Sequence, residues 1–206
     1  IECSVDALYE SIKKANIVFL MAPRHHSAMK YVGPIRAELG IRTIFNLLGP
    51  LSNPSLVNKI MIGVYDQHWL QPFAEALKQL GTTKAWIVHG HSNLDELSTT
   101  GVNKICSLDN GQIKKFSLHP SELGIPKTKL KNLIGGNANS NAKSILDLFN
   151  NKNSYFKDIV LLNASAALVA TGHEKNLQDA LKRSEISIKD GKAMEALEKL
   201  IHITNL

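Results

Sequence analysis

Hydrophobic and polar positions along the chain follow the period of a helix in some segments and form short unbroken apolar runs in others. Residues 60–65 (IMIGVY) and 85–88 (AWIV) are such runs, which predict strands buried on both faces. Between them, residues 67–80 place apolar side chains on one helical stripe, and Gly81 ends the segment. The stripe is Leu70, Phe73, Ala74, Leu77 and Leu80. A strand, a helix and a strand with short connections predict a βαβ unit, so the sheet should be at least partly parallel.

The second half of the chain predicts a hairpin followed by helices. Residues 104–108 and 112–118 flank Asp109-Asn110-Gly111, a strong signal for a hairpin turn. Residues 141–149 have helical apolar spacing. Residues 159–170 are apolar on nearly all sides, which predicts a buried helix. Asn163 lies inside that helix and needs a polar partner, which we expect in a neighbouring loop.

The two ends of the chain are amphipathic. Residues 4–16 predict a helix with Ser4 as its N-cap, and residues 17–21 predict a short buried strand or loop. Residues 176–203 form two amphipathic segments separated at Gly191. We find no repeats, low-complexity tracts or linker, so residues 1–206 are expected to form one α/β domain with a partly parallel central sheet flanked by helices.

Composition restricts the class of protein only loosely. The chain has 206 residues, 44% of them apolar, which is enough for a real core. It contains no apolar run long enough to span a bilayer. Cys3 and Cys106 have no metal-ligand spacing and favour a reduced, cytoplasmic protein, although a chain that starts at Ile1 is weak evidence about targeting. The net charge of +6 is compatible with binding of an anionic substrate or of nucleic acid, and it does not distinguish between the two.

Residues 19–54 are the part of the chain richest in groups suited to an anionic ligand. The stretch predicts two short helical segments separated by Gly33-Pro34, and a turn at residues 46–54 in which Gly and Pro shape the backbone. Its cations and imidazoles are Arg24, His25, His26, Lys30, Arg36 and Arg42. Arginine carries a permanently charged planar fork that matches a carboxylate. The alternative, a solvated basic helix face, stays open on chemistry alone.

Residues 89–101 (HGHSNLDELSTTG) follow the second predicted strand. Ligands of such sheets bind beyond the carboxyl ends of the strands, so this loop is a candidate site. Its adjacent carboxylates, Asp95 and Glu96, suit Mg²⁺, and the alternative is a solvated acidic pair or a helix N-terminal charge. His89 and His91 are interpreted as loop histidines, because no third nitrogen or sulfur ligand has suitable spacing.

Several motifs in residues 19–54 occur together without gaps. They are F-x-x-A-P at residues 19–23, V-x-P-I-R at 32–36, and R-T-I-F-N-L-L-G-P-L at 42–51 followed by N-P at 53–54. This run resembles the core of the anthranilate phosphoribosyltransferase family, and residues 89–98 resemble its H-G-x-x-x-L-D-E-x-S segment. Ser27 departs from the family, most members of which have Pro, and we interpret this as a tolerable change of a backbone-shaping residue.

The resemblance implies a fold, a reaction and a set of site residues. The family shares its fold with pyrimidine nucleoside phosphorylases. It transfers phosphoribose from phosphoribosyl pyrophosphate to anthranilate, a step of tryptophan biosynthesis. On this basis Asp95 and Glu96 would hold Mg²⁺, Arg36 would pair with the anthranilate carboxylate, His26 would line the same pocket, and Pro50 would shape its wall. No residue is assigned as a general acid or base, because the aryl amine is neutral at pH 7.

The resemblance also implies that parts of the family's enzyme lie outside this chain. The family has a small helical domain and a G-T-G-G-D loop for the pyrophosphate, followed by a K-H-G-N segment, and none of these occurs in residues 1–206. We therefore expect a partial catalytic domain, inactive alone, from a protein that is a homodimer when complete.

Two other functions remain open from the sequence. A pyrimidine nucleoside phosphorylase would share the fold, but the run at residues 42–51 with the L-D-E loop favours anthranilate chemistry. A same-fold protein that binds nucleic acid would suit the +6 charge. Against it, the lysines are scattered and aromatic residues make up only 6% of the chain.

Overall fold

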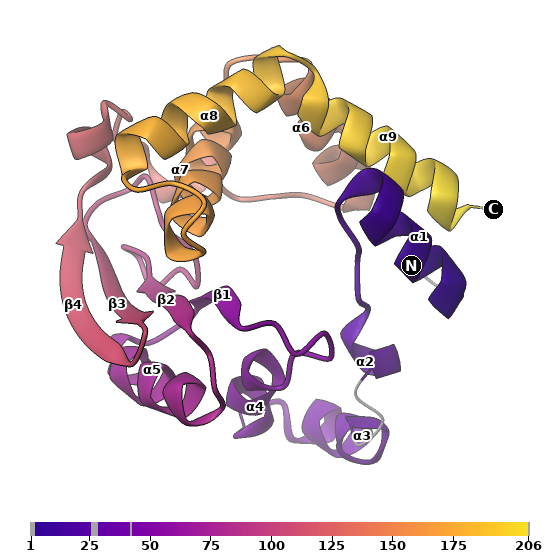
Figure 1. Cartoon of the computed structure of the whole chain (residues 1–206), viewed down its shortest axis with the longest axis vertical. Helices are drawn as coiled ribbons and strands as arrows, with labels where there is room; N and C mark the ends of the chain where they lie inside the picture. Colours follow the sequence, from indigo (N-terminus) through magenta and orange to yellow (C-terminus); the bar gives the residue numbers. More distant parts are fainter. Residues whose placement is uncertain (1–2, 26–28, 42, 206) are drawn as a thin grey trace. The chain divides into compact units, whose positions relative to one another are not determined.

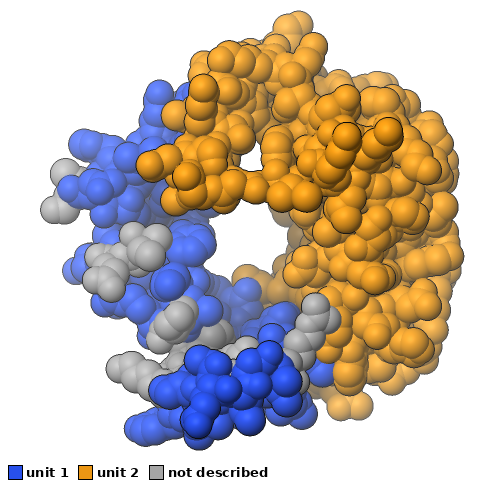
Figure 2. Space-filling view, turned by 180° about the vertical axis from the view of Figure 1, so that it is seen from behind, with its two compact units in different colours: residues 1–56, 192–206 blue, residues 57–191 orange. Residues whose placement is uncertain are grey.

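The computed structural model describes residues 3–25, 29–41 and 43–205, and it divides the chain into two compact units. Unit 1 consists of residues 1–56 and 192–206, and unit 2 of residues 57–191 (Figure 2). The expectation that residues 1–206 form one domain stays a prediction.

Unit 2 is built on a mixed four-stranded sheet. Its strands are β1 (Lys59–Gly63), β2 (Lys84–His89), β3 (Asn103–Asp109) and β4 (Gln112–Leu118). They lie in the order β1-β2-β3-β4, with β1 and β2 parallel and the other pairs antiparallel. A short 3₁₀ turn, η1 (Gln67–Trp69), and helix α5 (Leu70–Gln79) connect β1 to β2. The predicted βαβ unit and the α/β class with a partly parallel sheet are confirmed.

Helices cover both faces of this sheet. The remaining helices of unit 2 are α6 (Ala138–Phe149), α7 (Tyr155–Ala170) and α8 (Leu177–Lys189), with 3₁₀ turns η2 (Pro120–Leu123) and η3 (Leu130–Asn132). Leu162 and Ala166 of α7 pack with Val88 and Ile105 in one buried cluster. Helix α5 contacts β2 and β3, and it lies on the opposite face of the sheet from α7 (Figure 1). The side chains of each strand alternate between these two faces.

Two expectations about burial are wrong in this unit. β1 is only partly buried: Ile62 is buried at 6% exposure, whereas Ile60 and Met61 are half-buried, with Met61 packed against the core cluster. It lies at the edge of the sheet, where β2 is its one neighbour among the described strands. Leu80 is 63% exposed rather than part of the apolar stripe, because α5 has already ended at Gln79. Gly81 follows with φ of 85°, the left-handed conformation expected of a glycine after a helix.

The predicted hairpin forms as expected. Asn110 and Gly111 join β3 to β4 with φ of 46° and 84°. Two successive positive φ values match the twist of the flanking strands, and asparagine followed by glycine adopts them at low cost. The pairing of Asp109 with Gln112 then sets the register of both strands.

In unit 1, helix α1 (Val5–Ala15) packs against α9 (Lys192–Thr204). The Ser4 hydroxyl accepts a hydrogen bond from the Ala7 N–H (3.2 Å), which confirms the predicted N-cap. Gly191, with φ of 73°, separates α8 from α9 as predicted. No helix of the described part of the chain is long and apolar enough to cross a membrane.

Three local expectations in unit 1 are wrong. Gly33-Pro34 does not separate two segments, because α3 (Met29–Leu39) runs through it. The fixed φ of proline is itself helical, so Pro34 removes one hydrogen bond without ending the helix. Similarly, residues 45–51 form helix α4 (Phe45–Leu51) rather than a turn, and the turn begins after it. Residues 17–21 form a loop that is not buried, with Phe19 54% exposed. A further short helix of this stretch is α2 (Ala22–His25).

Candidate functional site

The loop that carries Asp95 and Glu96 leaves the sheet at the carboxyl end of β2. β1 and β2 are parallel, and Gly63 at the end of β1 lies opposite Val88. The chain therefore leaves both strands at the same edge of the sheet, the edge at which α/β folds bind ligands. The location predicted for the two carboxylates is the one that the structure shows.

A tight turn returns this loop to the sheet. The Gly90 N–H donates to the Leu94 carbonyl (2.8 Å). Ser92 and Asn93, between them, have φ of 68° and 58°. Asparagine tolerates this left-handed conformation better than most residues, so the turn has a local origin in the sequence. Its effect is to place the next two residues, the acidic pair, back at the strand ends.

Two glycines allow the backbone of the acidic pair to lie directly against those strand ends. A Cβ on Gly63 would overlap the carbonyl oxygen of Asp95, and a Cβ on Gly90 would overlap that of Glu96. Sequence reasoning assigned neither contact, because both are made between segments distant in the chain or across a turn. The available signal was Gly63 within the first predicted strand and Gly90 shortly after the second.

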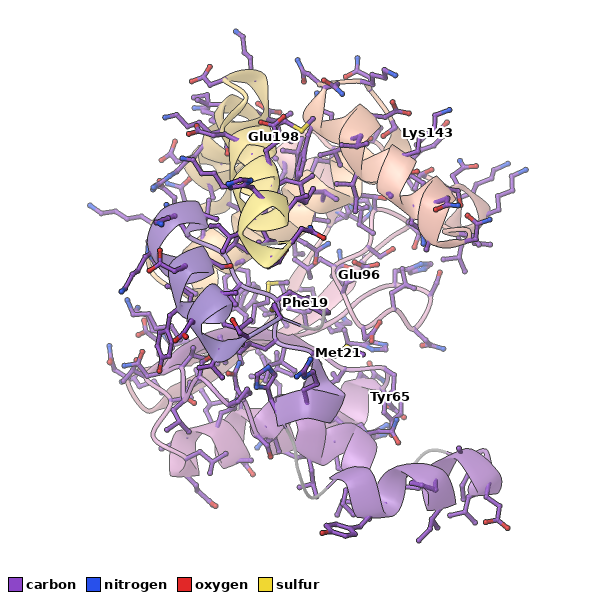
Figure 3. All side chains as sticks on the ribbon, turned by 90° about the vertical axis from the view of Figure 1, so that its right-hand side faces the viewer. Phe19, Met21, Tyr65, Glu96, Lys143 and Glu198 are labelled. Carbon is purple, nitrogen blue, oxygen red and sulfur yellow. The ribbon has the colours of Figure 1, made fainter. Side chains whose placement is uncertain are left out.

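The two carboxylates form a site of concentrated negative charge. Asp95 and Glu96 are both exposed residues, and Figure 3 labels Glu96 on its loop. Partial burial of its carboxyl group raises the pKa of Glu96, and the negative charge of Asp95 raises it further. Neither side chain forms an ion pair with a described residue. A bound cation would favour the ionised form of Glu96 and oppose both effects.

This pair supplies hard oxygen ligands, and it supplies only two. Within residues 3–25, 29–41 and 43–205, no group of three or more His, Cys, Asp or Glu side chains is arranged to hold a metal. A site with two carboxylates fits Mg²⁺, which keeps several waters and takes substrate phosphates as further ligands. It does not fit a closed structural metal site.

The loop histidines have structural partners. His89 Nδ1 lies 2.9 Å from the Val64 carbonyl oxygen. His91 Nδ1 lies 2.9 Å from the Thr100 hydroxyl. These contacts support the interpretation of both as loop histidines, since each imidazole helps to close the connection that follows a strand.

Two asparagines hold the loop beyond the acidic pair. The Asn163 amide of α7 exchanges two hydrogen bonds with the backbone of Leu97 (2.9 and 2.7 Å). The Asn103 amide at the start of β3 does the same with the backbone of Ser98 (2.7 and 3.0 Å). The expectation that Asn163 contacts a neighbouring loop is confirmed, whereas nothing in the local sequence indicated Asn103.

The residues assigned to the anthranilate side lie in unit 1. Pro50 is an exposed residue of α4, and Arg36 belongs to α3, although its side chain lies outside the described part. His26 and Arg42 also lie outside the described residues. The structure thus brings Asp95 and Glu96 together on one loop of unit 2, and places Arg36 and Pro50 on separate helices of unit 1.

Comparison with known proteins identifies the family. Residues 1–194 match the model of the glycosyl transferase family, a/b domain. The chain belongs to this family. Among curated members, it is 46% identical over 205 residues to the anthranilate phosphoribosyltransferases of Brucella suis and Brucella canis. Each match includes 100% of this chain and 60% of the relative, so the chain spans about three fifths of the length of these glycosyl transferases.

Solved structures of the family share the fold. The anthranilate phosphoribosyltransferase from Thermus thermophilus matches with a TM-score of 0.91 and 34% identity, over 100% of this chain and 61% of that one. The Saccharomyces cerevisiae enzyme in complex with PRPP and Mg matches with a TM-score of 0.89 and 30% identity, over 97% and 58%. The same yeast enzyme in complex with 4-fluoroanthranilate gives 0.88 and 29%, over 98% and 60%. The resemblance carried by residues 19–54 and 89–98 is confirmed.

Proposed function

We propose that this chain is part of an enzyme that transfers phosphoribose from phosphoribosyl pyrophosphate to anthranilate and releases pyrophosphate. The observation that carries the proposal is the 46% identity over 205 residues to proteins named anthranilate phosphoribosyltransferase. The matched region includes the whole loop at residues 89–101. The relatives described above have this activity in their names, and this favours anthranilate over the pyrimidine nucleosides of the related phosphorylases.

The anthranilate side is assigned to unit 1. Arg36 pairs its guanidinium with the carboxylate of anthranilate, a charge-assisted contact that also orients the amine. His26 makes a polar contact in the same pocket, and Pro50 shapes its wall. The solved yeast complex with 4-fluoroanthranilate supports a pocket for such a compound in this family.

The metal is assigned to Asp95 and Glu96. Both offer hard oxygen atoms on a loop held by backbone and asparagine contacts. Burial raises the pKa of Glu96, the charge of Asp95 raises it further, and a cation would oppose both effects. Mg²⁺, when bound, stabilises negative charge on pyrophosphate. The yeast relative solved with PRPP and Mg supports this choice of ion.

The reaction needs positioning more than acid–base chemistry. The bond between ribose C1 and the pyrophosphate oxygen breaks, the bond between C1 and the anthranilate nitrogen forms, and the amine proton leaves to solvent. Positive charge builds on the ribose as the first bond breaks, by analogy with glycoside cleavage. Arg36 contributes by holding the amine near C1, and the backbone contacts of the 89–101 loop contribute by fixing Asp95 and Glu96. The complete enzyme is proposed to be a homodimer in the cytoplasm.

The test is loss of anthranilate fluorescence in the presence of phosphoribosyl pyrophosphate and Mg²⁺. Two proteins are compared: this chain alone, and this chain fused to the part of the Brucella suis relative that it does not match. We expect turnover by the fusion and none by residues 1–206. A folded fusion without turnover would contradict the proposal, and a salt-dependent titration with DNA would then test the nucleic-acid alternative.

A further inference from the structure

The side chain of Asn163 forms a two-bond pair with the backbone of the candidate metal loop. Its Oδ1 accepts from the Leu97 N–H (2.9 Å), and its Nδ2 donates to the Leu97 carbonyl (2.7 Å). The two residues are 66 positions apart in the chain. A carboxamide that bonds both polar groups of one residue fixes the position and the orientation of that part of the backbone.

The orientation of the Asn163 amide is itself determined. Its second Nδ2 hydrogen donates to the Ile159 carbonyl within α7 (2.9 Å). A rotated amide would place its oxygen against two carbonyl oxygens, of Ile159 and Leu97, so the observed orientation is strongly favoured. The neighbouring residues Leu162 and Ala166 are fully buried in the core cluster, which anchors this part of α7.

The contact lies directly beside the acidic pair. Leu97 follows Glu96, and its side chain is fully buried in the same core cluster as Leu162. The peptide bond between Glu96 and Leu97 also contains the Glu96 carbonyl, whose oxygen lies against Gly90. The peptide that joins Glu96 to Leu97 is therefore held from β2 and from α7, and the Glu96 side chain extends from a fixed backbone.

We infer that Asn163 is a positioning residue for the metal site, which holds the loop so that Asp95 and Glu96 present their carboxylates together. The inference rests on the proposed function, which assigns Mg²⁺ to this pair. A site with two protein ligands cannot order its own loop as a fully protein-ligated site can, so its affinity depends on neighbouring contacts that orient the ligands.

The first test examines the contact without turnover. In this chain, Asn163→Leu keeps the approximate shape of the side chain without adding a charge and removes its hydrogen bonds to Leu97 and Ile159, and Asn163→Ala removes the whole side-chain amide. We expect hydrogen exchange of the Leu97 amide to become about 10-fold faster or more in the alanine variant, with the amide of Ile87 in β2 unchanged. Ser165→Ala is the control, since Ser165 is a buried polar residue of α7 that bonds Leu161 in its own helix (2.6 Å).

The second test examines the metal. In the fusion that turns over, we expect Asn163→Leu and Asn163→Ala to raise the half-saturating Mg²⁺ concentration about 10-fold or more, with kcat at saturating Mg²⁺ within about 2-fold of the parent. Ser165→Ala should leave the Mg²⁺ dependence unchanged. A purely structural role of Asn163 would instead lower the amount of folded enzyme without changing the half-saturating concentration.

The outcomes separate the inference from the proposed function. If the parent turns over and both Asn163 variants retain its Mg²⁺ dependence, the inference is overturned and the proposed function stands. If a folded parent does not turn over, the proposed function fails, and the inference fails with it even where the Leu97 amide behaves as expected. Faster Leu97 exchange together with a raised Mg²⁺ requirement would support both.

Discussion

Two adjacent carboxylates and one arginine from an earlier part of the sequence carry most of the chemistry proposed for this chain. The acidic pair is described in full: Asp95 and Glu96 are exposed, and they form no ion pair with a described residue. Burial and the Asp95 charge raise the pKa of Glu96, so the pair is electrostatically unfavourable without a cation. At the residue scale, the two assignments are tested separately.

For the acidic pair, the change is Asp95→Asn together with Glu96→Gln in the fusion enzyme. Both substitutions keep the size of the side chain and remove its charge, so turnover should be lost or its Mg²⁺ requirement weakened. The measurement is the initial rate across a Mg²⁺ titration. Asp190→Asn, an exposed acidic residue at the end of α8, is the control. A double variant with the parent's Mg²⁺ curve would remove the metal assignment.

For the anthranilate side, the change is Arg36→Ala in the same enzyme. Loss of one charge-assisted pair should lower kcat/KM for anthranilate by about an order of magnitude or more. Arg183→Ala is a matched control, because Arg183 is an exposed arginine paired with Glu174 on the surface of unit 2 (2.8 Å). Steady-state kinetics with anthranilate as the varied substrate decide the outcome, and equal values for Arg36→Ala and the parent would exclude Arg36 from the pocket.

At the scale of single elements, local sequence predicted most of what forms. The Asn110-Gly111 hairpin, the Ser4 N-cap and the break at Gly191 depend on backbone conformation and nearby hydrogen bonds, which a short segment contains by itself. The wrong predictions for single elements also came from local signals. Gly33-Pro34 is a common boundary signal, yet a proline φ is compatible with a helix, and α3 continues through it.

The contact between β1 and the acidic loop supports a prediction at this scale. In Gly63→Ala, the new Cβ would overlap the Asp95 carbonyl oxygen, so the loop backbone must move. We expect the free energy of unfolding to fall by about 1–3 kcal/mol, the usual cost of forcing an extra methyl group into a packed contact. Urea denaturation of residues 1–206 is the measurement.

Gly33→Ala is the matched control for this prediction. Gly33 lies within α3, and a Cβ there meets no described atom within 4 Å. Because Gly33 precedes Pro34, whose ring disfavours a helical backbone for a residue with a Cβ, this alanine should not stabilise the chain, and it should destabilise it by less than Gly63→Ala does. Equal stabilities of Gly63→Ala and the parent would show that the close approach at β1 does not matter.

For the whole molecule, the division into two units has a consequence for folding. The main buried cluster, which includes Val88, Leu97, Ile105 and Leu162, lies entirely within residues 57–191. A chain of residues 57–191 should therefore fold alone and unfold in one cooperative transition. Circular dichroism during heating tests this, and a broad, non-cooperative transition would contradict it.

The control for that experiment is Leu162→Ala in the same shortened chain. Leu162 is fully buried between α7 and the sheet, so its truncation should cost about 2–5 kcal/mol. A transition that does not respond to this substitution would show that the shortened chain lacks the packed core of unit 2.

The sequence by itself determined the family, the α/β class, the βαβ unit and the position of Asp95 and Glu96 on the loop after the second strand, because each depends on residues close together in the chain. It also indicated that Asn163 needed a partner, since an amide in an apolar helix is costly unless it is bonded. Only the tertiary structure decided that the partner is the Leu97 backbone, that Gly63 lies against Asp95, and that β1 lies at the edge of the sheet. These contacts join segments separated by tens of residues, and pairwise packing between such segments leaves no periodic signal in either one.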